Sequence, residues 1–136
     1  MKINPEVYIL FSTYEDYKSM PGSLTPEEMA GLHKQILDDA KLDADSADLF
    51  KNVFAAAVKY SQSRAGWPLW DREKRMGEDS ARTSRHNQVI DSLNILARYL
   101  KAQGKAAMWR DVLGEDRKRI GDFACYLVFV GSLNAR

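Results

Sequence analysis

The chain has 136 residues, 45% of them hydrophobic and 29% charged, and a formal net charge of +1. This length suits one domain whose core needs no covalent staples. Its one cysteine excludes an internal disulfide framework, and its two histidines exclude a His-rich metal centre, so we expect no metal and no cofactor. No apolar run is long enough to span a bilayer, and residues 1–6 lack the features of a secretory signal. We therefore expect a cytoplasmic protein with no membrane partner.

The first predicted element is a helix over residues 5–20, because its apolar residues recur at helical spacing. Proline is favoured in the first turn of a helix, so the helix begins at Pro5, and it stops before the turn signal at Pro21. Its apolar stripe consists of Val7, Leu10, Phe11, Tyr14 and Tyr17.

Two further helices are predicted in the first half of the chain. Thr25 and Glu28, with a proline between them, form a capping box that begins a helix reaching about Lys41. The next helix starts at Asp45 or Ser46 and ends at Gly66. Its apolar stripe consists of Leu49, Phe50, Val53, Phe54, Ala57, Val58 and Tyr60.

Residues 66–79 are predicted to be the only long irregular segment, with at most a helical turn or two in its charged part. A fourth helix then runs from about Ser80 to Gln103. A short element over residues 106–113 follows, and the last helix covers residues 115–133.

These elements predict an all-α fold, a single compact helical bundle of five to six helices over residues 1–136. Residues 123–130 are apolar on every side, which places the last helix at the centre of a bundle or in a dimer interface. Because this coverage exceeds what a small bundle needs, we expect the partner to include a second copy of the chain, in a homodimer.

Charge is unevenly distributed. Residues 1–63 contain six lysines, no arginine and ten acids, and residues 64–136 contain all ten arginines and all three tryptophans. The two parts therefore carry net charges of −4 and +5. This asymmetry is compatible with a basic surface for nucleic acid or an acidic protein, and equally with two halves whose charges pair across their contact.

Cys125 and the two histidines are weak candidates for chemistry. Cys125 lies in the most apolar stretch of the chain, which predicts a buried, inert thiol. His33 and His86 have no second ligand three or four residues away, the spacing that metal sites on helices use.

A stronger candidate is a polar cluster in the second half. Arg82 and His86 extend the apolar stripe of the fourth helix, Arg85 flanks it, and Asp122 interrupts the last helix beside Gly121. Polar groups that face other helices need partners. We therefore predict one of two arrangements for Arg82, His86 and Asp122. They line a pocket that binds a small anion or a carboxylate side chain, or they form a buried network that fixes the register of the helices.

The tryptophans are candidates for the roof of this pocket or for a protein interface. Trp67 and Trp70 enclose a proline, and exposed tryptophans beside arginines are typical interface anchors. This loop could equally seal one end of the bundle, and Trp109 is a further candidate for the roof of the pocket.

The segment from Arg82 to Leu100, together with residues 113–117 and 120–123, resembles a group of small bacterial all-helical proteins of unknown function. The resemblance covers roughly residues 67–130. It implies a small bacterial all-helical fold and supplies no activity.

The leading hypothesis for function is a non-enzymatic binding or regulatory module that acts through a protein interface formed by the tryptophan-rich loop and the basic half. The alternative is a nucleic-acid-associated protein that contacts phosphates through its arginines. An enzyme or anion binder that uses Arg82, His86 and Asp122 ranks third.

Overall fold

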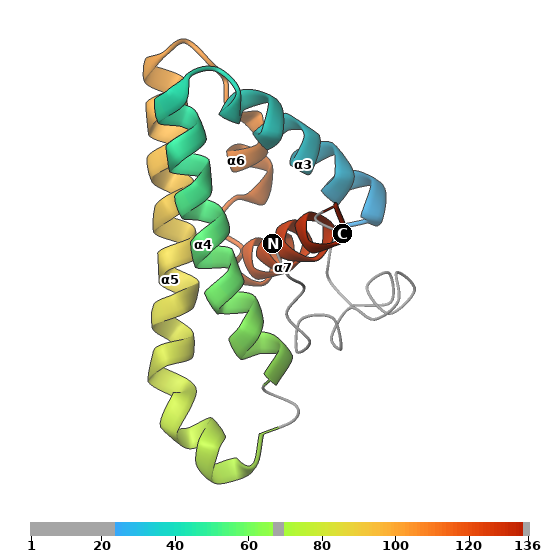
Figure 1. Ribbon diagram of the computed structural model, residues 1–136, viewed down its shortest axis with the longest axis vertical. Coiled ribbons are helices and arrows are strands. Elements are labelled where there is room, and N and C mark those ends of the chain that lie inside the picture. Colours follow the sequence, from blue (N-terminus) through green and yellow to red (C-terminus); the bar gives the residue numbers. More distant parts are fainter. Residues whose placement is uncertain (1–23, 67–69, 135–136) are drawn as a thin grey trace.

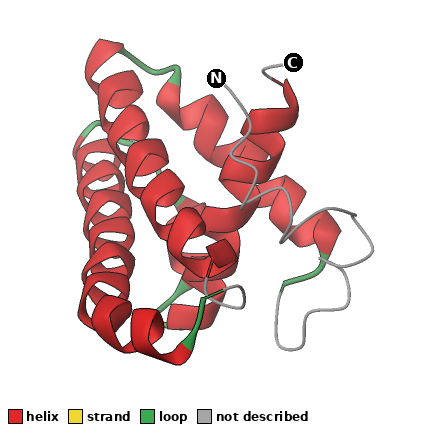
Figure 2. Cartoon of the chain, turned by 60° about the horizontal axis from the view of Figure 1, so that its bottom comes forward, coloured by secondary structure: helices red, strands yellow, loops and turns green. Residues whose placement is uncertain are grey.

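Two long antiparallel helices, α4 (Ala44–Gly66) and α5 (Arg72–Ala102), lie side by side and form the frame of the structure (Figure 1). The computed structural model describes residues 24–66 and 70–134. Helix α3 (Pro26–Ala40) leads into the start of α4, and α6 (Met108–Leu113) and α7 (Arg117–Asn134) follow α5. These ranges contain five helices and no strand (Figure 2), which confirms the all-α fold. The helix predicted over residues 5–20 lies outside them.

Short side chains fix the helix starts as the sequence predicts. In α3, the Thr25 hydroxyl accepts a hydrogen bond from the Glu28 amide at 3.1 Å, and the Glu28 carboxylate accepts one from the Thr25 amide at 3.0 Å. This reciprocal pair is the predicted capping box. Helix α4 begins slightly before the predicted residue, because the Asp43 carboxylate accepts from the amide of Ser46 at 2.7 Å.

The predicted start of the fourth helix at Ser80 is wrong, since α5 already begins at Arg72. Asp71 caps it: the carboxylate accepts a hydrogen bond from the Lys74 amide at 2.8 Å. No side chain from Arg72 to Gln88 is buried, so this first half of α5 obtains little stabilisation from the core. The hairpin of α4 and α5 therefore extends well beyond the other helices (Figure 1).

Helix α7 is the centre of the core, as its composition predicts. Every residue from Ile120 to Val128 is buried, and α7 packs chiefly against α4. Helices of the same chain cover it, so its apolar coverage no longer requires a second copy. Among the described residues, no helix has both the length and the apolar character of a membrane span.

A close approach between α7 and α4 occurs at Gly121. A Cβ atom at this position would lie 3.0 Å from Cζ of the buried Tyr60 and still closer to the Tyr60 hydroxyl. Gly121 therefore lets α4 and α7 come together, which matches the close backbone approach that a glycine inside a helix suggests.

Gly121→Ala should destabilise the fold by about 1 kcal/mol, because overpacking costs about 1–3 kcal/mol and the better helix propensity of alanine returns about 0.5–1 kcal/mol. Urea denaturation measures this loss. In a Tyr60→Phe background the loss should shrink, since the hydroxyl that meets the new methyl is gone. The matched control is Gly77→Ala in α5, where a Cβ meets nothing within 4 Å. A loss at Gly77 equal to that at Gly121 would contradict the close-approach argument.

Candidate functional site

Asp122 is fully buried in α7, and two cations hold its carboxylate. Arg64 Nη2 from the last turns of α4 lies 2.5 Å from Oδ1, and Lys118 Nζ lies 3.0 Å from Oδ2. The structure thus supplies the cationic partner that a buried carboxylate needs. It comes from Arg64 of α4, a residue that sequence reasoning did not single out, and not from Arg82.

Arg82 and His86 lie elsewhere on α5. The Arg82 side chain is 44% exposed and pairs with Asp79 one turn earlier at 3.6 Å. His86 Nε2 donates to the backbone carbonyl of Arg117 at 2.8 Å, and its ring stacks on Tyr60. The prediction that Arg82, His86 and Asp122 line one open pocket is wrong, because Asp122 is closed off from solvent and Arg82 is at the surface.

Cys125 has the buried environment that the sequence predicts. Burial raises the pKa of its thiol, although Arg64 Nη1 lies 4.0 Å from the sulfur and acts in the opposite direction. The thiol is therefore protonated and inaccessible, as in an inert core cysteine.

Both histidines are half-buried and are not arranged as metal ligands. Burial lowers the pKa of His33, whose ring meets the edge of Tyr126. Burial, followed by the charge of Arg117, lowers the pKa of His86. Within residues 24–66 and 70–134, no group of three His, Cys, Asp or Glu side chains could hold a metal ion.

The three tryptophans have different positions. Trp109 is a fully buried core residue, and its indole nitrogen donates to the Asp39 carboxylate at 3.0 Å. It is therefore unavailable as a surface anchor, contrary to the prediction for this residue. Trp67 lies outside the described residues. Trp70 is half-buried at the far end of the hairpin, with Lys74 Nζ 4.6 Å from its ring centroid.

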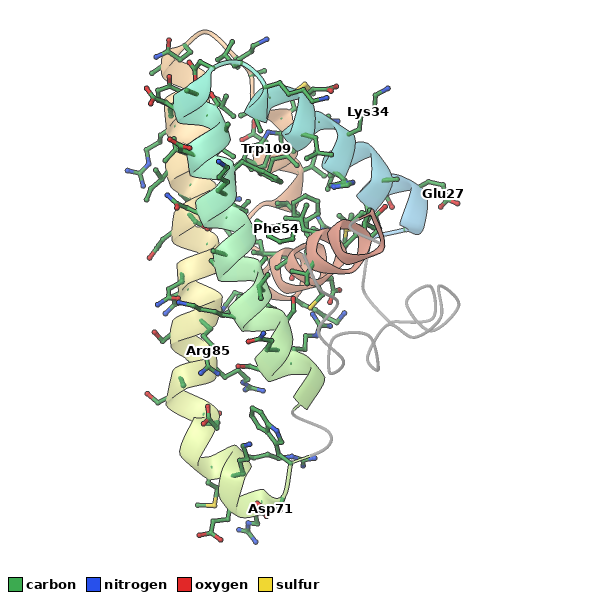
Figure 3. All side chains as sticks on the ribbon, viewed as in Figure 1. Glu27, Lys34, Phe54, Asp71, Arg85 and Trp109 are labelled. Atoms are coloured by element: carbon green, nitrogen blue, oxygen red, sulfur yellow. The ribbon has the colours of Figure 1, made fainter. Side chains whose placement is uncertain are left out.

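Trp70 and Arg85 line a polar hollow of about 600 Å³ between α4 and α5, which we call the cationic cleft. Arg85, which is labelled in Figure 3, donates a hydrogen bond to the Ser63 hydroxyl and lies 3.5 Å from the Glu78 carboxylate. The charged lining residues are three cations and one acid: Lys59, Lys74, Arg85 and Glu78. The described lining of the cleft thus carries a surplus of positive charge, and its α5 wall is the first half of α5, which has no buried side chain.

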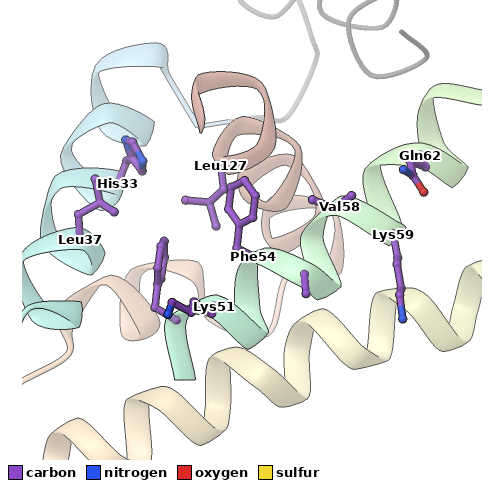
Figure 4. Close-up of a pocket in the computed structure, with 10 residues that line it drawn as sticks. His33, Leu37, Lys51, Phe54, Val58, Lys59, Gln62 and Leu127 are labelled. Atoms are coloured by element: carbon purple, nitrogen blue, oxygen red, sulfur yellow. The ribbon is translucent and has the colours of Figure 1, made fainter. Parts of the chain in front are cut away.

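A second hollow, of about 800 Å³, lies between α3, α4 and α7, and we call it the apolar groove. His33 and Leu37 of α3 and Leu127 of α7 face Phe54 of α4 (Figure 4). Phe50 and Val58 complete its apolar lining.

Sequence reasoning treated the residues of this groove as ordinary core. On α4, Val53, Ala57 and Tyr60 are buried, whereas Phe50, Phe54 and Val58 of the same predicted stripe are only half-buried. The apolar stripe of α4 is wider than its contact with the core requires. This width is the feature of the sequence that could have identified the groove.

The two hollows meet on α4. Lys59 and Gln62 line both of them. The Lys59 side chain extends away from the groove towards α5 (Figure 4). The apolar groove and the cationic cleft are therefore neighbours on α4, and Lys59 and Gln62 lie at their border.

The arginines at the start of α7 contact neighbouring parts of the chain. Arg117 donates to the Asn87 side chain at 2.9 Å, and Arg119 donates to the Val112 carbonyl at 2.9 Å. Helix α7 is buried from Ile120 onward, so it cannot enter a DNA groove as a recognition helix.

Comparisons with protein-family models, with curated proteins and with solved structures find no match to this chain. Function must therefore be inferred from the surface itself, and the resemblance to small bacterial helical proteins stays a prediction.

Asp122→Asn should lower the free energy of unfolding by about 2 kcal/mol, because the half-buried Arg64 would lose its anionic partner, and the solvent that reaches it softens the penalty of an unpaired charge. Urea denaturation followed by circular dichroism measures the change. Asp79→Asn, which breaks the exposed pair with Arg82, is the matched control and should cost about 0.5 kcal/mol or less. Equal small losses in both variants would show that the Asp122 pair does not stabilise the fold.

Acidification should destabilise the protein as the pH falls from 7 to about 5. The pKa of His33 and His86 is lowered in the folded state from the ordinary 6.5, so the unfolded chain binds protons first. The lowered pKa values of Glu28 and Asp43 act only below their ordinary 4.5 and 3.8. Urea midpoints across this range measure the effect. His86→Gln should flatten the slope, and an unchanged slope in His33→Gln/His86→Gln would contradict the assignment.

Proposed function

We propose that the protein is a non-enzymatic binding module that receives an amphipathic helical segment of a partner protein. The apolar face of that segment lies in the apolar groove, and its acidic residues lie at the cationic cleft. The observation that carries this proposal is that the apolar groove and the cationic cleft lie next to each other on α4, with Lys59 and Gln62 lining both.

The shape of the groove favours a helix as its occupant. Phe50 and Gln62 stand at its two ends on α4, which corresponds to about 18 Å at 1.5 Å per residue, or about three turns of a docked helix. A helix of that length presents apolar residues at positions i, i+3, i+4 and i+7 to a groove. Phe50 and Phe54 offer aromatic surface of the kind that dominates binding energies.

The charge of the surface selects an acidic partner. The described lining of the cleft contains three cations, Lys59, Lys74 and Arg85, and one acid, Glu78. Arg85 is held in place by Ser63 and Glu78, so little side-chain freedom is lost when it meets a carboxylate. Such complementarity adds specificity and speeds association.

Short amphipathic helices selected from a phage-displayed library against the full chain should carry an apolar stripe flanked by Asp or Glu. Phe54→Asp should weaken their binding at least about tenfold, a loss of about 1.4 kcal/mol, because it places a charge in the apolar contact. Fluorescence anisotropy with the selected peptides measures the dissociation constants.

The matched control is Ile95→Asp, a change at an exposed apolar residue of α5 outside the groove, which should leave binding unchanged. Lys59→Glu tests the charge without touching the core and should weaken acidic peptides selectively. Circular dichroism and urea midpoints show whether each variant is folded. Peptides that bind wild type, Phe54→Asp and Lys59→Glu equally would overturn the proposal.

A further inference from the structure

We propose that residues 5–20 of the same chain occupy the apolar groove as a helix and compete there with the partner. This inference rests on the proposed function, because it concerns the regulation of the same site. Three features carry it: the apolar pattern of the segment, its charge, and the point at which it enters the described structure.

The segment has the pattern that the groove accepts. Its apolar stripe of Val7, Leu10, Phe11, Tyr14 and Tyr17 has the i, i+3, i+4, i+7 spacing of a helix that binds in a groove. Residues 5–20 in helical form are about 24 Å long at 1.5 Å per residue, enough to cover the distance from Phe50 to Gln62 along α4.

The charges of the segment and the groove are opposite. Residues 5–20 carry a net charge of −2, because they contain three acids, Glu6, Glu15 and Asp16, and one lysine, Lys18. Among the described residues that line the groove, the charged ones are Lys51 and, at the border with the cationic cleft, Lys59; both are exposed, and no acid is among them. An apolar helix with an acidic flank therefore fits this surface better than a neutral one.

The connection to α3 brings the segment to the groove. Leu24 is buried where the described chain begins, and α3, which starts two residues later, supplies His33 and Leu37 to one wall of the groove. Residues 21–23, which include the turn signal Pro21-Gly22, are the only link between the predicted helix and Leu24. Helices joined by so short a loop pack as antiparallel neighbours. We therefore place the segment antiparallel to α3, on the side of α3 that supplies His33 and Leu37 to the groove.

A nitroxide on Ser12→Cys in the full chain tests this arrangement. Ser12 lies opposite the apolar stripe of the predicted helix, and the native Cys125 is buried and does not compete for the label. We expect the methyl signals of Leu37, Val58 and Leu127 to lose most of their intensity, whereas those of Ile95 and Met76 keep theirs. Undiminished groove methyl signals would overturn the proposal.

Two further samples separate docking in cis from other causes. Leu10→Asp/Phe11→Asp breaks the apolar stripe and should restore the intensity of the groove methyl signals, and persistent broadening would overturn the proposal. A mixture of nitroxide-bearing chains and isotope-labelled chains without nitroxide should show no broadening. Broadening in the mixture would mean that the segment docks on a second copy, which also overturns docking in cis.

Competition is measured with a helical peptide selected against wild type. Its dissociation constant should fall by about tenfold in Leu10→Asp/Phe11→Asp, the change expected if the segment fills the site in about nine molecules of ten. Equal affinities for this variant and wild type, with the groove methyl signals broadened in the wild-type chain, would overturn only the competition. If no peptide binds even the variant while the methyl signals are broadened, the proposed partner binding fails, and docking of the segment stands.

Discussion

The buried ion pair between Asp122 and Arg64 is the constraint on which the arrangement of the core depends. Helix α7 is apolar on every side, and a carboxylate in such surroundings is tolerated only beside a well-placed cation. That cation comes from the last turns of α4, so the pair fixes where α4 crosses α7. Gly121, one residue away, lets Tyr60 of α4 pack at the same crossing. Polar pairing and close packing therefore specify one register between these two helices.

This register determines which apolar residues of α4 are not buried in the core. Because Val53, Ala57 and Tyr60 face the core, Phe50 and Phe54 of the same apolar stripe lie at its edge. They line the groove between α3, α4 and α7 instead of filling the core. Half-buried aromatic side chains that line a groove instead of filling the core favour a role in binding.

Local signals in the sequence predict the fold better than they predict the site. Thr25 and Glu28 satisfy backbone groups within one turn, so the start of α3 can be deduced from the residues alone. The start of α5 was missed because Asp71 follows a tryptophan-rich loop and precedes residues without an apolar stripe. Arg64 was missed because its partner is distant in the sequence, and helical periodicity cannot show which cation meets Asp122. The groove depends on three helices, so no single stretch of sequence contains it.

The uneven charge of the chain follows from the same packing. Arg64, Arg82 and Arg85 pair with acids of their own basic half, while Asp39 and Asp43 of the acidic half accept hydrogen bonds from the neutral Trp109 and Tyr99. These contacts do not neutralise one half with the other. The described lining of the cleft contains three cations and one acid, and residues 1–63 carry a net charge of −4. Opposite surpluses in one chain favour a contact between them, and a partner with the chemistry of the acidic part would compete for the same surface.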